Sequence, residues 1–399
     1  MLTPAQAEEL IRQELTCMPI ESLPLAQCYG AVLRENVYAE RDQPPFDRVA
    51  MDGIALDTTA LAVAGTRLRI LGTQAAGDPP LELTDPAGCI EVMTGAVLPT
   101  GCDAVIPVEQ LAIEHGFAQL RVSSPPRPWQ NVHRRSSDGK QGALLLASGT
   151  RLGAPEVAIA ASAGMARVRV SAQPRVTVIS TGNELIEPGE PILAHQIRRS
   201  NVYGILAALR CHGFQRVGDD HLRDDADELR RRLKFHLDTH DVVILSGGVS
   251  AGRFDLVPQV LAELGVRMAF HHLAQRPGKP MWFGVAPDGV TVFALPGNPV
   301  STLVCLARYV VPALFVAMGQ TQAPPAKVSL TDAASVQTKL TSFLPVRLEN
   351  DEWGRTAAAP CPTNGSGDFT ALAGTDGFVE LPPGPNTYPR GFVTRLYRW

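Results

Sequence analysis

The sequence predicts a multidomain α+β protein with a three-layer α/β domain, β-rich N-terminal domains and a C-terminal β-barrel or sandwich. Its 399 residues are enough for about 2–4 domains. Strand-like and helix-like runs alternate between residues 174 and 323, which is typical of a parallel sheet covered by helices on both faces. Short apolar runs broken by Gly and Pro fill the regions 20–170 and 327–399, which indicates strands joined by many loops.

The bulk composition favours a globular, cytoplasmic protein. Hydrophobic residues make up 45% of the chain and charged residues 19%, with a net charge of −4, so a nucleic-acid or anionic-membrane surface is not expected. The N-terminus lacks the features of a signal peptide, and no apolar stretch reaches the length of about 18 residues that spans a membrane. The seven cysteines form no CxxC pair, which disfavours a zinc ribbon or a disulfide framework and fits a reducing compartment.

The first 170 residues begin with a helix and continue mainly as strands. Thr3 suits the N-cap of an amphipathic helix over 3–15, Pro4 suits its first turn, and Gln6 completes a capping box. Apolar runs then predict strands at 68–71, 88–93 and 104–108, followed by a short helix at 154–163 and a strand at 166–170.

The α/β region contains the strongest alternation of elements. The predicted strands cover residues 176–180, 242–246 and 290–295, and the predicted helices cover 200–212, 225–237, 257–264 and 299–316. A Pro-rich linker at 322–326 then separates this region from the C-terminal strands.

Three segments of the α/β region share one design, in which an apolar strand leads through a Gly- or Pro-rich turn into a helix. They span 176–185, 241–255 and 290–302, and Asn298 and Pro299 suit the N-cap and first position of the third helix. In a parallel sheet such turns lie at the carboxyl edge, where helix N-termini can bind an anion. Each turn could be an ordinary connection, but three together favour a phosphate or nucleotide site. The absence of a Lys-Ser/Thr ending disfavours a Walker-type NTPase.

Acidic residues accompany these turns and point to a metal ion. Glu184 and Asp255 follow two of the turns, and Asp224 precedes a predicted helix. Two unit charges about 4 Å apart repel by roughly 4 kcal/mol at an effective dielectric of 20, which a hard cation would remove. Mg²⁺ takes one or two carboxylates together with phosphate oxygens, so Asp224 and Asp255 are candidate ligands. Asp224 also fits the acidic start of a solvated helix.

Basic residues supply the counterpart for an oxyanion. Arg276 and Lys279 flank a Pro-Gly turn, where Arg276 could clamp an oxyanion and Lys279 could act as a point charge, although turn cations are often only solvated. The neighbouring pair His271 and His272 is interpreted as structural, because no further ligand stands at metal-binding spacing.

Three loops of the β-rich region carry polar residues that could take part in chemistry. Asp52 lies in the segment 44–53, Thr94 lies at a strand-to-turn junction, and Asp138 follows the basic group 133–135. Each could be a packed turn with a satisfied side chain. The sequence contains no HExxH, GxSxG or kinase motifs, so hydrolysis by a nucleophilic side chain is not supported.

Six motifs in order make the chain similar to a known family. They are PFDRVAMDG, EVMTGAVLPTGCDAVIPVE, STGNEL, SGGVSAGRFD, RPGKP and LPGNPVST. Together they resemble the MoeA/gephyrin E-domain family of molybdopterin molybdenumtransferases. The resemblance extends from about residue 3 to the C-terminus and is strongest between 44 and 302.

The resemblance implies an elongated homodimer of four-domain subunits with a C-terminal β-barrel. Its α/β domain would be of the molybdopterin-adenylyltransferase type. The implied division is an N-terminal helix (1–19) packed on the α/β domain, an elongated linker domain (20–38 and 142–173), an inserted β-rich domain (39–141), the α/β molybdopterin-binding domain (174–324) and the barrel (325–399).

The resemblance also implies a reaction: Mg²⁺-dependent insertion of molybdate into adenylylated molybdopterin, with release of AMP. By motif, the implied catalytic residues are Asp52, Thr94, Asp138, Glu184, Asp224, Asp255, Arg276 and Lys279. The implied substrate-binding residues are Ser246, Gly247, Gly248, Ser250, Pro296, Gly297, Pro299 and Ser301, and the implied metal ligands are Asp224 and Asp255. In the family dimer, the loops of Asp52 and Thr94 complete the site of the other subunit. A molybdopterin adenylyltransferase and client molybdoenzymes are the further implied partners.

Four positions depart from the common family pattern: Val49, Ile54, Asn183 and Arg276. They leave open a tungstate-selective or client-dedicated paralogue. A nucleotide hydrolase or adenylyltransferase with the same α/β domain is an alternative that the motifs of Asp52 and Thr94 disfavour. A non-enzymatic scaffold is a second alternative, which the retained acids and Lys279 disfavour.

Overall fold

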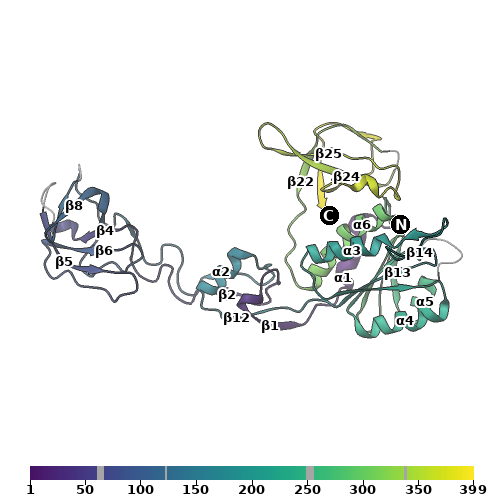
Figure 1. The fold of residues 1–399 in the computed structure, drawn as a ribbon, viewed down its shortest axis with the longest axis horizontal. Helices are drawn as coiled ribbons and strands as arrows, with labels where there is room; N and C mark the ends of the chain where they lie inside the picture. Colours follow the sequence, from purple (N-terminus) through teal and green to yellow (C-terminus); the bar gives the residue numbers. More distant parts are fainter. Residues whose placement is uncertain (61–66, 122–123, 249–255, 337–338) are drawn as a thin grey trace.

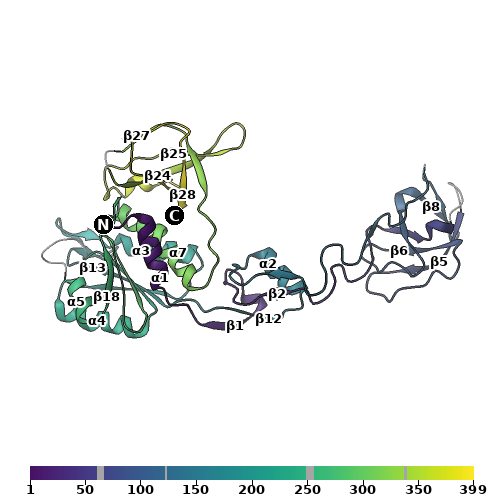
Figure 2. The ribbon, with the colours of Figure 1, turned by 180° about the vertical axis from the view of Figure 1, so that it is seen from behind.

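The computed structural model describes residues 1–60, 67–121, 124–248, 256–336 and 339–399. Figure 1 shows an elongated molecule with a β-rich unit at one end, a small unit in the middle, and an α/β unit with a second β-rich unit at the other end. Figure 2 shows the same arrangement from behind, with the N-terminal helix lying against the α/β unit. The multidomain α+β class predicted from the sequence is confirmed.

The N-terminal helix is α1 (Pro4–Glu14), as predicted. Its capping box is complete, because Thr3 Oγ1 accepts from the Gln6 amide at 3.3 Å and the Thr3 amide donates to Gln6 Oε1 at 2.9 Å. Ala7 and Ile11 are buried in the core of the α/β unit. The helix is therefore part of that unit, although the α/β strands begin more than a hundred and fifty residues later.

The distal unit is a six-stranded sheet in the order β7-β4-β6-β5-β9-β8. Alternate residues of its strands pack into two cores, one on each face; Ile54 belongs to one core and Ala55 to the other. The three strands predicted in this region are confirmed. The bounds are β4 Gly53–Leu56, β5 Arg67–Gln74, β6 Gly88–Val92, β7 Ala104–Pro107, β8 Leu111–Glu114 and β9 Phe117–Leu120.

Replacing Gly53 with Ala is expected to destabilise this sheet by about 1–3 kcal/mol, the usual cost of overpacking. A Cβ at Gly53 would lie 1.9 Å from the carbonyl oxygen of Ile106 in the paired strand, so β4 and β7 would have to separate. Hydrogen exchange of the peptides covering β4 and β7 measures the effect locally. Gly72→Ala is the matched control, because its Cβ would meet only the end of the Leu81 side chain, at 3.3 Å. Equal protection in both variants would contradict the prediction.

The middle unit is built from two segments that flank the distal sheet in sequence. β1 (Ile20–Pro24) pairs antiparallel with β12 (Arg167–Ser171), and β2 (Val37–Tyr38) pairs with β11 (Leu144–Leu146). The predicted helix is present as α2 (Ala154–Ser162). The chain thus leaves through this unit, forms the distal sheet and returns, as Figure 1 shows.

The α/β unit contains a six-stranded sheet in the order β16-β13-β17-β21-β20-β18. The strands are β13 Val176–Thr181, β16 Val217–Leu222, β17 Val242–Ser246, β18 Arg267–His271, β20 Trp282–Val285 and β21 Thr291–Leu295. The predicted parallel pairing is confirmed for β13, β17 and β21 and extends to β16, whereas β20, which the sequence analysis did not predict as a strand, runs antiparallel to both β21 and β18. A short turn joins β20 to β21, and a turn of this length can connect only antiparallel neighbours.

Helices cover both faces of this sheet and make three layers. One core contains Val178 with α3 and α7, and the other contains Ile179 with α4 and α5. The helices are α3 Ser200–Cys211, α4 Ala226–Thr239, α5 Val257–Glu263, α6 Pro299–Cys305 and α7 Val311–Ala317. A π-helical segment, Leu306–Val310, joins α6 to α7.

The continuous helical run Pro299–Ala317 is long and apolar enough to cross a membrane, with a mean hydropathy of 1.9. The sequence analysis predicted a helix over 299–316 but expected no apolar stretch long enough to span a membrane. However, 78% of the apolar window is buried inside the protein, and Val310 and Leu314 belong to the core of the α/β unit. The run is therefore a core helix of this unit.

The C-terminal unit resolves the alternatives of barrel and sandwich in favour of a barrel. The pairings β24–β25–β22–β28–β26 return from β26 to β24 and close a ring of five strands. A further strand, β19 (Gln275–Arg276), comes from the α/β unit and pairs with β24. The barrel strands are β22 Lys327–Leu330, β24 Thr341–Asn350, β25 Thr356–Pro360, β26 Gly377–Leu381 and β28 Val393–Arg398.

Candidate functional site

The three predicted turns meet at one edge of the α/β sheet. β13, β17 and β21 are adjacent and parallel, and they end at the same level of the sheet, with Ser180 opposite Ser246 and Ser246 opposite Leu295. The second and third turns touch, since a Cβ at Gly297 would lie 3.7 Å from the Cα of Gly247. The expectation that these turns share the carboxyl edge is confirmed.

The second turn requires glycine at two positions. Gly247 and Gly248 have φ angles of +99° and +70°, which other residues rarely adopt. A Cβ at Gly248 would lie 2.7 Å from Val257 Cγ2, so the turn also packs too closely for a side chain. Ser250 and Asp255, which belong to the same motif, lie outside the described residues.

A pocket of about 410 Å³ opens beside these turns, and we call it the edge pocket. Within the described residues, two buried atoms that face this region lack a hydrogen-bond partner, Thr181 Oγ1 and Asn201 Oδ1. Unpaired buried polar atoms are costly, so they are available to a ligand. The pocket is lined by Ser180, Thr181, Glu184, Leu185, Ile197, Arg198, Arg199, Ser200, Asn201, Val202, Ser246, Gly247, Gly297, Asn298, Pro299, Gly367 and Phe369.

Asn201 connects the turns and was missed by the sequence analysis. From α3, its Nδ2 lies 3.0 Å from Ser246 Oγ, 2.7 Å from the Gly297 carbonyl and 3.2 Å from Thr302 Oγ1. The amide therefore holds the ends of β17 and β21 together. The available signal was a polar Ser-Asn pair at the start of a predicted helix, which on its own fits an ordinary helix N-terminus.

Arg199 is a buried cation whose charge is already matched. Its Nε donates to Ser180 Oγ at 2.7 Å, and its two terminal nitrogens contact Glu187 at 3.1 Å and Asp219 at 2.6 Å. Because its donors are occupied, Arg199 shapes the wall of the edge pocket and is not a free anion ligand.

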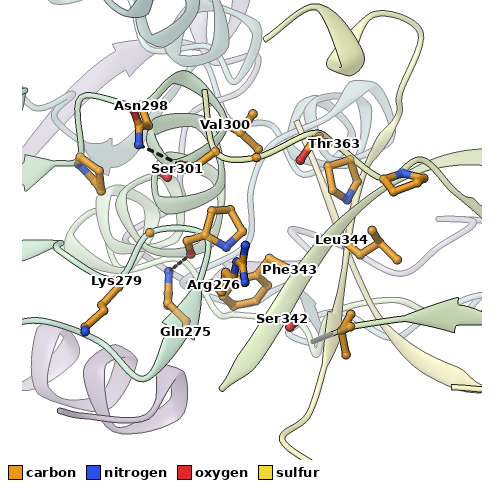
Figure 3. Close-up of a pocket in the computed structure, with 18 of the residues that line it drawn as sticks. Gln275, Arg276, Lys279, Asn298, Val300, Ser301, Ser342, Phe343, Leu344 and Thr363 are labelled. Atoms are coloured by element: carbon orange, nitrogen blue, oxygen red, sulfur yellow. Dashed lines mark hydrogen bonds between the residues drawn. The ribbon is translucent and has the colours of Figure 1, made fainter. Parts of the chain in front are cut away.

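A larger cleft of about 710 Å³ lies between the α/β unit and the barrel (Figure 3). The α/β unit contributes both cations of the Pro-Gly turn and Ser301, while the barrel contributes hydroxyl and amide groups that the sequence analysis did not single out. These barrel residues include Ser335, Ser342, Thr363, Asn364 and Ser366. Their side chains are common in any loop, so no sequence pattern identified them.

Arg276 and Lys279 are the free cations of this cleft. Both side chains are exposed, and in the described part of the chain neither forms an ion pair. Figure 3 shows them extending in different directions from their loop. An anion in the cleft would therefore meet cations whose charge is not neutralised by acids.

Asn298 links the cleft to the edge pocket, because it lines both. It occupies the N-cap position of α6, as predicted, but its side chain makes no capping hydrogen bond. Instead its Nδ2 donates to Ser366 Oγ of the barrel at 2.8 Å. The predicted capping side chain thus bridges two domains, and a ligand could extend from one hollow into the other.

Two predicted acids lie at the same edge. Glu184 lines the edge pocket and folds back on its own turn, since a Cβ at Gly182 would lie 2.4 Å from Glu184 Oε2. Asp224 and Asn183 exchange hydrogen bonds through their backbone amides and side-chain oxygens, both at 3.3 Å. Asn183 therefore places a neutral amide beside Asp224, where the common family pattern would place a second carboxylate.

Asp52 and Thr94 are brought together by the distal sheet. Asp52 Oδ1 accepts from Thr94 Oγ1 at 2.7 Å and from the Thr94 amide at 2.6 Å, and these bonds lower the pKa of Asp52. Asp138 accepts from His133 Nε2 at 2.7 Å, which lowers the pKa of Asp138. This unit lies at the opposite end of the molecule from the cleft, so one chain does not bring these acids to Arg276 (Figure 1).

Replacing Thr94 with Val is expected to raise the pKa of Asp52 toward its ordinary value of about 3.9, because the hydroxyl donor is lost. Because the pKa of Asp52 is lower in the folded protein than in the unfolded chain, its ionised form stabilises the fold. This stabilisation is fully present at pH values above the pKa of the unfolded chain, and it is lost as the pH falls through the pKa of the folded protein. Carboxyl NMR titration of Asp52 measures the shift. Thr59→Val is the control, because Thr59 Oγ1 donates to Asp57 instead. An unchanged Asp52 pKa in Thr94→Val would contradict the prediction.

Comparison with family models matches almost the whole chain. The MoeA N-terminal region (domain I and II) matches residues 2–164, a probable molybdopterin binding domain matches 177–315, and the MoeA C-terminal region (domain IV) matches 327–394.

Individual relatives agree with these matches. A molybdopterin molybdenumtransferase from Synechocystis is 40% identical over 402 residues and covers 100% of both chains. One from Haemophilus influenzae is 33% identical over 81% of this chain and 79% of its own. A crystal structure of a molybdopterin biosynthesis MoeA protein from Pyrococcus horikoshii superposes with a TM-score of 0.83 at 27% identity and covers 100% of both chains.

Proposed function

The chain belongs to the MoeA family of molybdopterin molybdenumtransferases, and from this premise we propose that it inserts molybdate into adenylylated molybdopterin and releases AMP. The observation that carries the proposal is the pair of adjoining hollows that share Asn298. One hollow contains glycine turns at a sheet edge, and the other contains free cations. Such a pair suits a substrate with a phosphorylated part and a second, oxyanionic substrate.

The cleft is proposed as the molybdate site. Arg276 and Lys279 supply positive charge, and Ser301, which is buried at the cleft wall, supplies a hydroxyl. The cations would stabilise charge on the oxyanion as it approaches the dithiolene of the pterin. Ser342 and Ser366 of the barrel would complete its hydrogen bonds.

The edge pocket is proposed to hold adenylylated molybdopterin. Ser246, Gly247 and Gly248 form one turn, and Pro296, Gly297 and Pro299 form the other, so backbone groups can approach a phosphate closely. The unpaired Thr181 Oγ1 and Asn201 Oδ1 would find partners on the bound substrate. Glu184 lies in the same pocket.

Mg²⁺ is the proposed cofactor. Among the described residues no three His, Cys, Asp or Glu side chains gather as a metal site, so a resident all-protein cage is not expected there. The exposed oxygen donor of Asp224 fits Mg²⁺, which takes one or two carboxylates together with substrate phosphates. Asp224 and Asp255 would hold the ion, which when bound would neutralise the pyrophosphate during its cleavage.

Asp52 and Thr94 of the distal unit are proposed to act across a homodimer. Their sheet lies far from the cleft of its own chain, so they would complete the site of a second subunit. The cytoplasm is the proposed compartment, and a molybdopterin adenylyltransferase and molybdoenzyme clients are the proposed partners.

The test of this function is AMP release and cofactor formation from adenylylated molybdopterin with Mg²⁺, comparing molybdate with tungstate. Molybdate-dependent turnover is expected. A preference for tungstate would instead indicate that the departures from the family pattern determine oxyanion specificity. These departures are Val49, Ile54, Asn183 and Arg276. Absence of turnover with either oxyanion would contradict the proposed function and favour a non-enzymatic scaffold or a nucleotide hydrolase.

Asp255→Asn is expected to abolish Mg²⁺-dependent AMP release, because a neutral amide cannot replace an anionic metal ligand. Circular dichroism and thermal unfolding check that the variant keeps its fold. Asp288→Asn serves as the control, since Asp288 lies at the turn between β20 and β21, away from the edge pocket. Normal AMP release by folded Asp255→Asn would refute the proposed role of Asp255.

A further inference from the structure

A buried side chain lies directly beneath the loop that carries the two free cations. Gln275 immediately precedes Arg276 and is fully buried, with an exposed fraction of 0%. Its Nε2 donates to the carbonyl oxygen of Pro277 at 3.1 Å, the bond drawn in Figure 3. The Gln275 amide thus spans the turn between Arg276 and Lys279 from below.

Tyr309 fixes the orientation of this amide. Its buried hydroxyl donates to Gln275 Oε1. The Pro277 carbonyl can only accept a hydrogen bond, so the NH₂ group of Gln275 must face it, and Oε1 must face Tyr309. The amide therefore has one satisfied orientation, and its rotation would leave polar atoms unpaired in the core.

The loop is packed against this pair without space for movement. A Cβ at Gly278 would lie 2.6 Å from Gln275 Nε2 and 2.6 Å from Cys305 Sγ. Cys305 ends α6, and Tyr309 lies in the π-helical segment that follows. Because Ser301 of α6 lines the cleft, the same helical run supports the loop from below and supplies the cleft wall.

The backbone of the loop is held in the same place by the barrel. β19 pairs with β24 so that Gln275 is opposite Thr341 and Arg276 is opposite Ser342. The backbone at Arg276 is thereby tied to the barrel strand, while the carbonyl at the far side of the turn is tied to Gln275 and Tyr309.

From these contacts we propose that Gln275 and Tyr309 are positioning residues for oxyanion binding, which act by holding Arg276 and Lys279 in the geometry that binds the anion. Tyr309 does not line the cleft, and the amide of Gln275, which does line it, is held by Tyr309 and the Pro277 carbonyl, so neither side chain is proposed to bind the anion directly. The proposal rests on the proposed function only in that the cleft is taken to bind molybdate.

The test is a double-mutant cycle on molybdate binding by the full-length protein, measured by isothermal titration calorimetry without the pterin substrate. Tyr309→Phe is expected to lower the affinity for molybdate about fivefold, since the freed amide no longer holds the turn. In an Arg276→Ala background the same substitution is expected to change the affinity less than about twofold, because only Lys279 remains of the two cations that it positions.

Tyr388→Phe is the matched control. Tyr388 is equally buried, and its hydroxyl also donates to a carbonyl, that of Pro382, but it lies in the barrel and outside the lining of the cleft. This variant is expected to lose stability and to keep the parent affinity. Where Tyr309→Phe does not fold, Gln275→Met is tested in the same cycle. It keeps the shape of the side chain and removes its hydrogen bonds to Tyr309, Pro277 and Cys305.

Three results would overturn the proposal. The first is an equal loss of affinity for Tyr309→Phe in both backgrounds, and the second is no loss in the parent background. The third is a lack of molybdate binding by the parent protein. The reaction is judged separately: molybdate binding with the expected coupling but no AMP release would refute the proposed function and leave this inference standing.

Discussion

Arg276→Ala is expected to weaken molybdate binding about 10- to 100-fold, which is the usual range for losing a hydrogen bond to a charged group. Arg276 lines the cleft and forms no ion pair with any described acid, so its charge is available to an incoming anion. The planar guanidinium can also make two parallel hydrogen bonds to an oxyanion, which an ammonium group cannot.

Two variants make this prediction specific. Arg276→Lys keeps the positive charge but lacks the planar guanidinium that makes two parallel hydrogen bonds, so it is expected to lose less affinity for molybdate than Arg276→Ala. Arg230→Ala removes a cation that is already paired with Glu263 at 2.7 Å on the surface, so it is expected to leave molybdate binding unchanged. Titration calorimetry at one ionic strength compares all three. Unchanged molybdate affinity in Arg276→Ala would contradict the assignment of the cleft as the molybdate site.

Arg308→Met is expected to destabilise the protein by about 3 kcal/mol, the cost of breaking a buried ion pair. Arg308 is 2% exposed and joins three parts of the chain. Its Nη2 donates to Glu8 of α1 at 2.8 Å, and its Nε lies 3.7 Å from Glu380 of the barrel. Its guanidinium also lies 4.9 Å from the ring centre of Tyr397, another barrel residue. Methionine would fill the space and leave the carboxylates with only their more distant cationic partners, Arg12 at 3.8 Å from Glu8 and Arg395 at 4.0 Å from Glu380.

Urea unfolding measures this loss, and two further variants test its cause. Arg230→Ala breaks exposed ion pairs and is expected to cost less than about 1 kcal/mol. Glu380→Gln in the Arg308→Met background is expected to recover part of the stability, because it removes a mostly buried carboxylate whose remaining cation, Arg395, lies 4.0 Å away. A loss for Arg308→Met no larger than that for Arg230→Ala would show that the cluster does not hold the domains together.

Local patterns predicted the individual elements well. The capping box at Thr3 and Gln6 predicted α1, and apolar runs predicted β13, β17 and β21 to within a residue or two. These predictions succeeded because caps and buried strands are specified by neighbouring residues. Strand β16 was missed, since Val217–Leu222 contains two aspartates and a histidine and lies at the edge of the sheet.

The sequence by itself therefore determined the class of the fold, the family and the three turns at the sheet edge, because each depends on short motifs. Only the tertiary structure decided which residues meet. Thr94 and Asp52 are 42 residues apart, and Asn298 and Ser366 are 68 apart, yet each pair is joined by a hydrogen bond. The antiparallel β20, the barrel serines in the cleft and the Tyr309–Gln275 pair follow from long-range pairing and packing. Such contacts leave no periodic pattern in a single chain, because either partner is an ordinary residue at its own position.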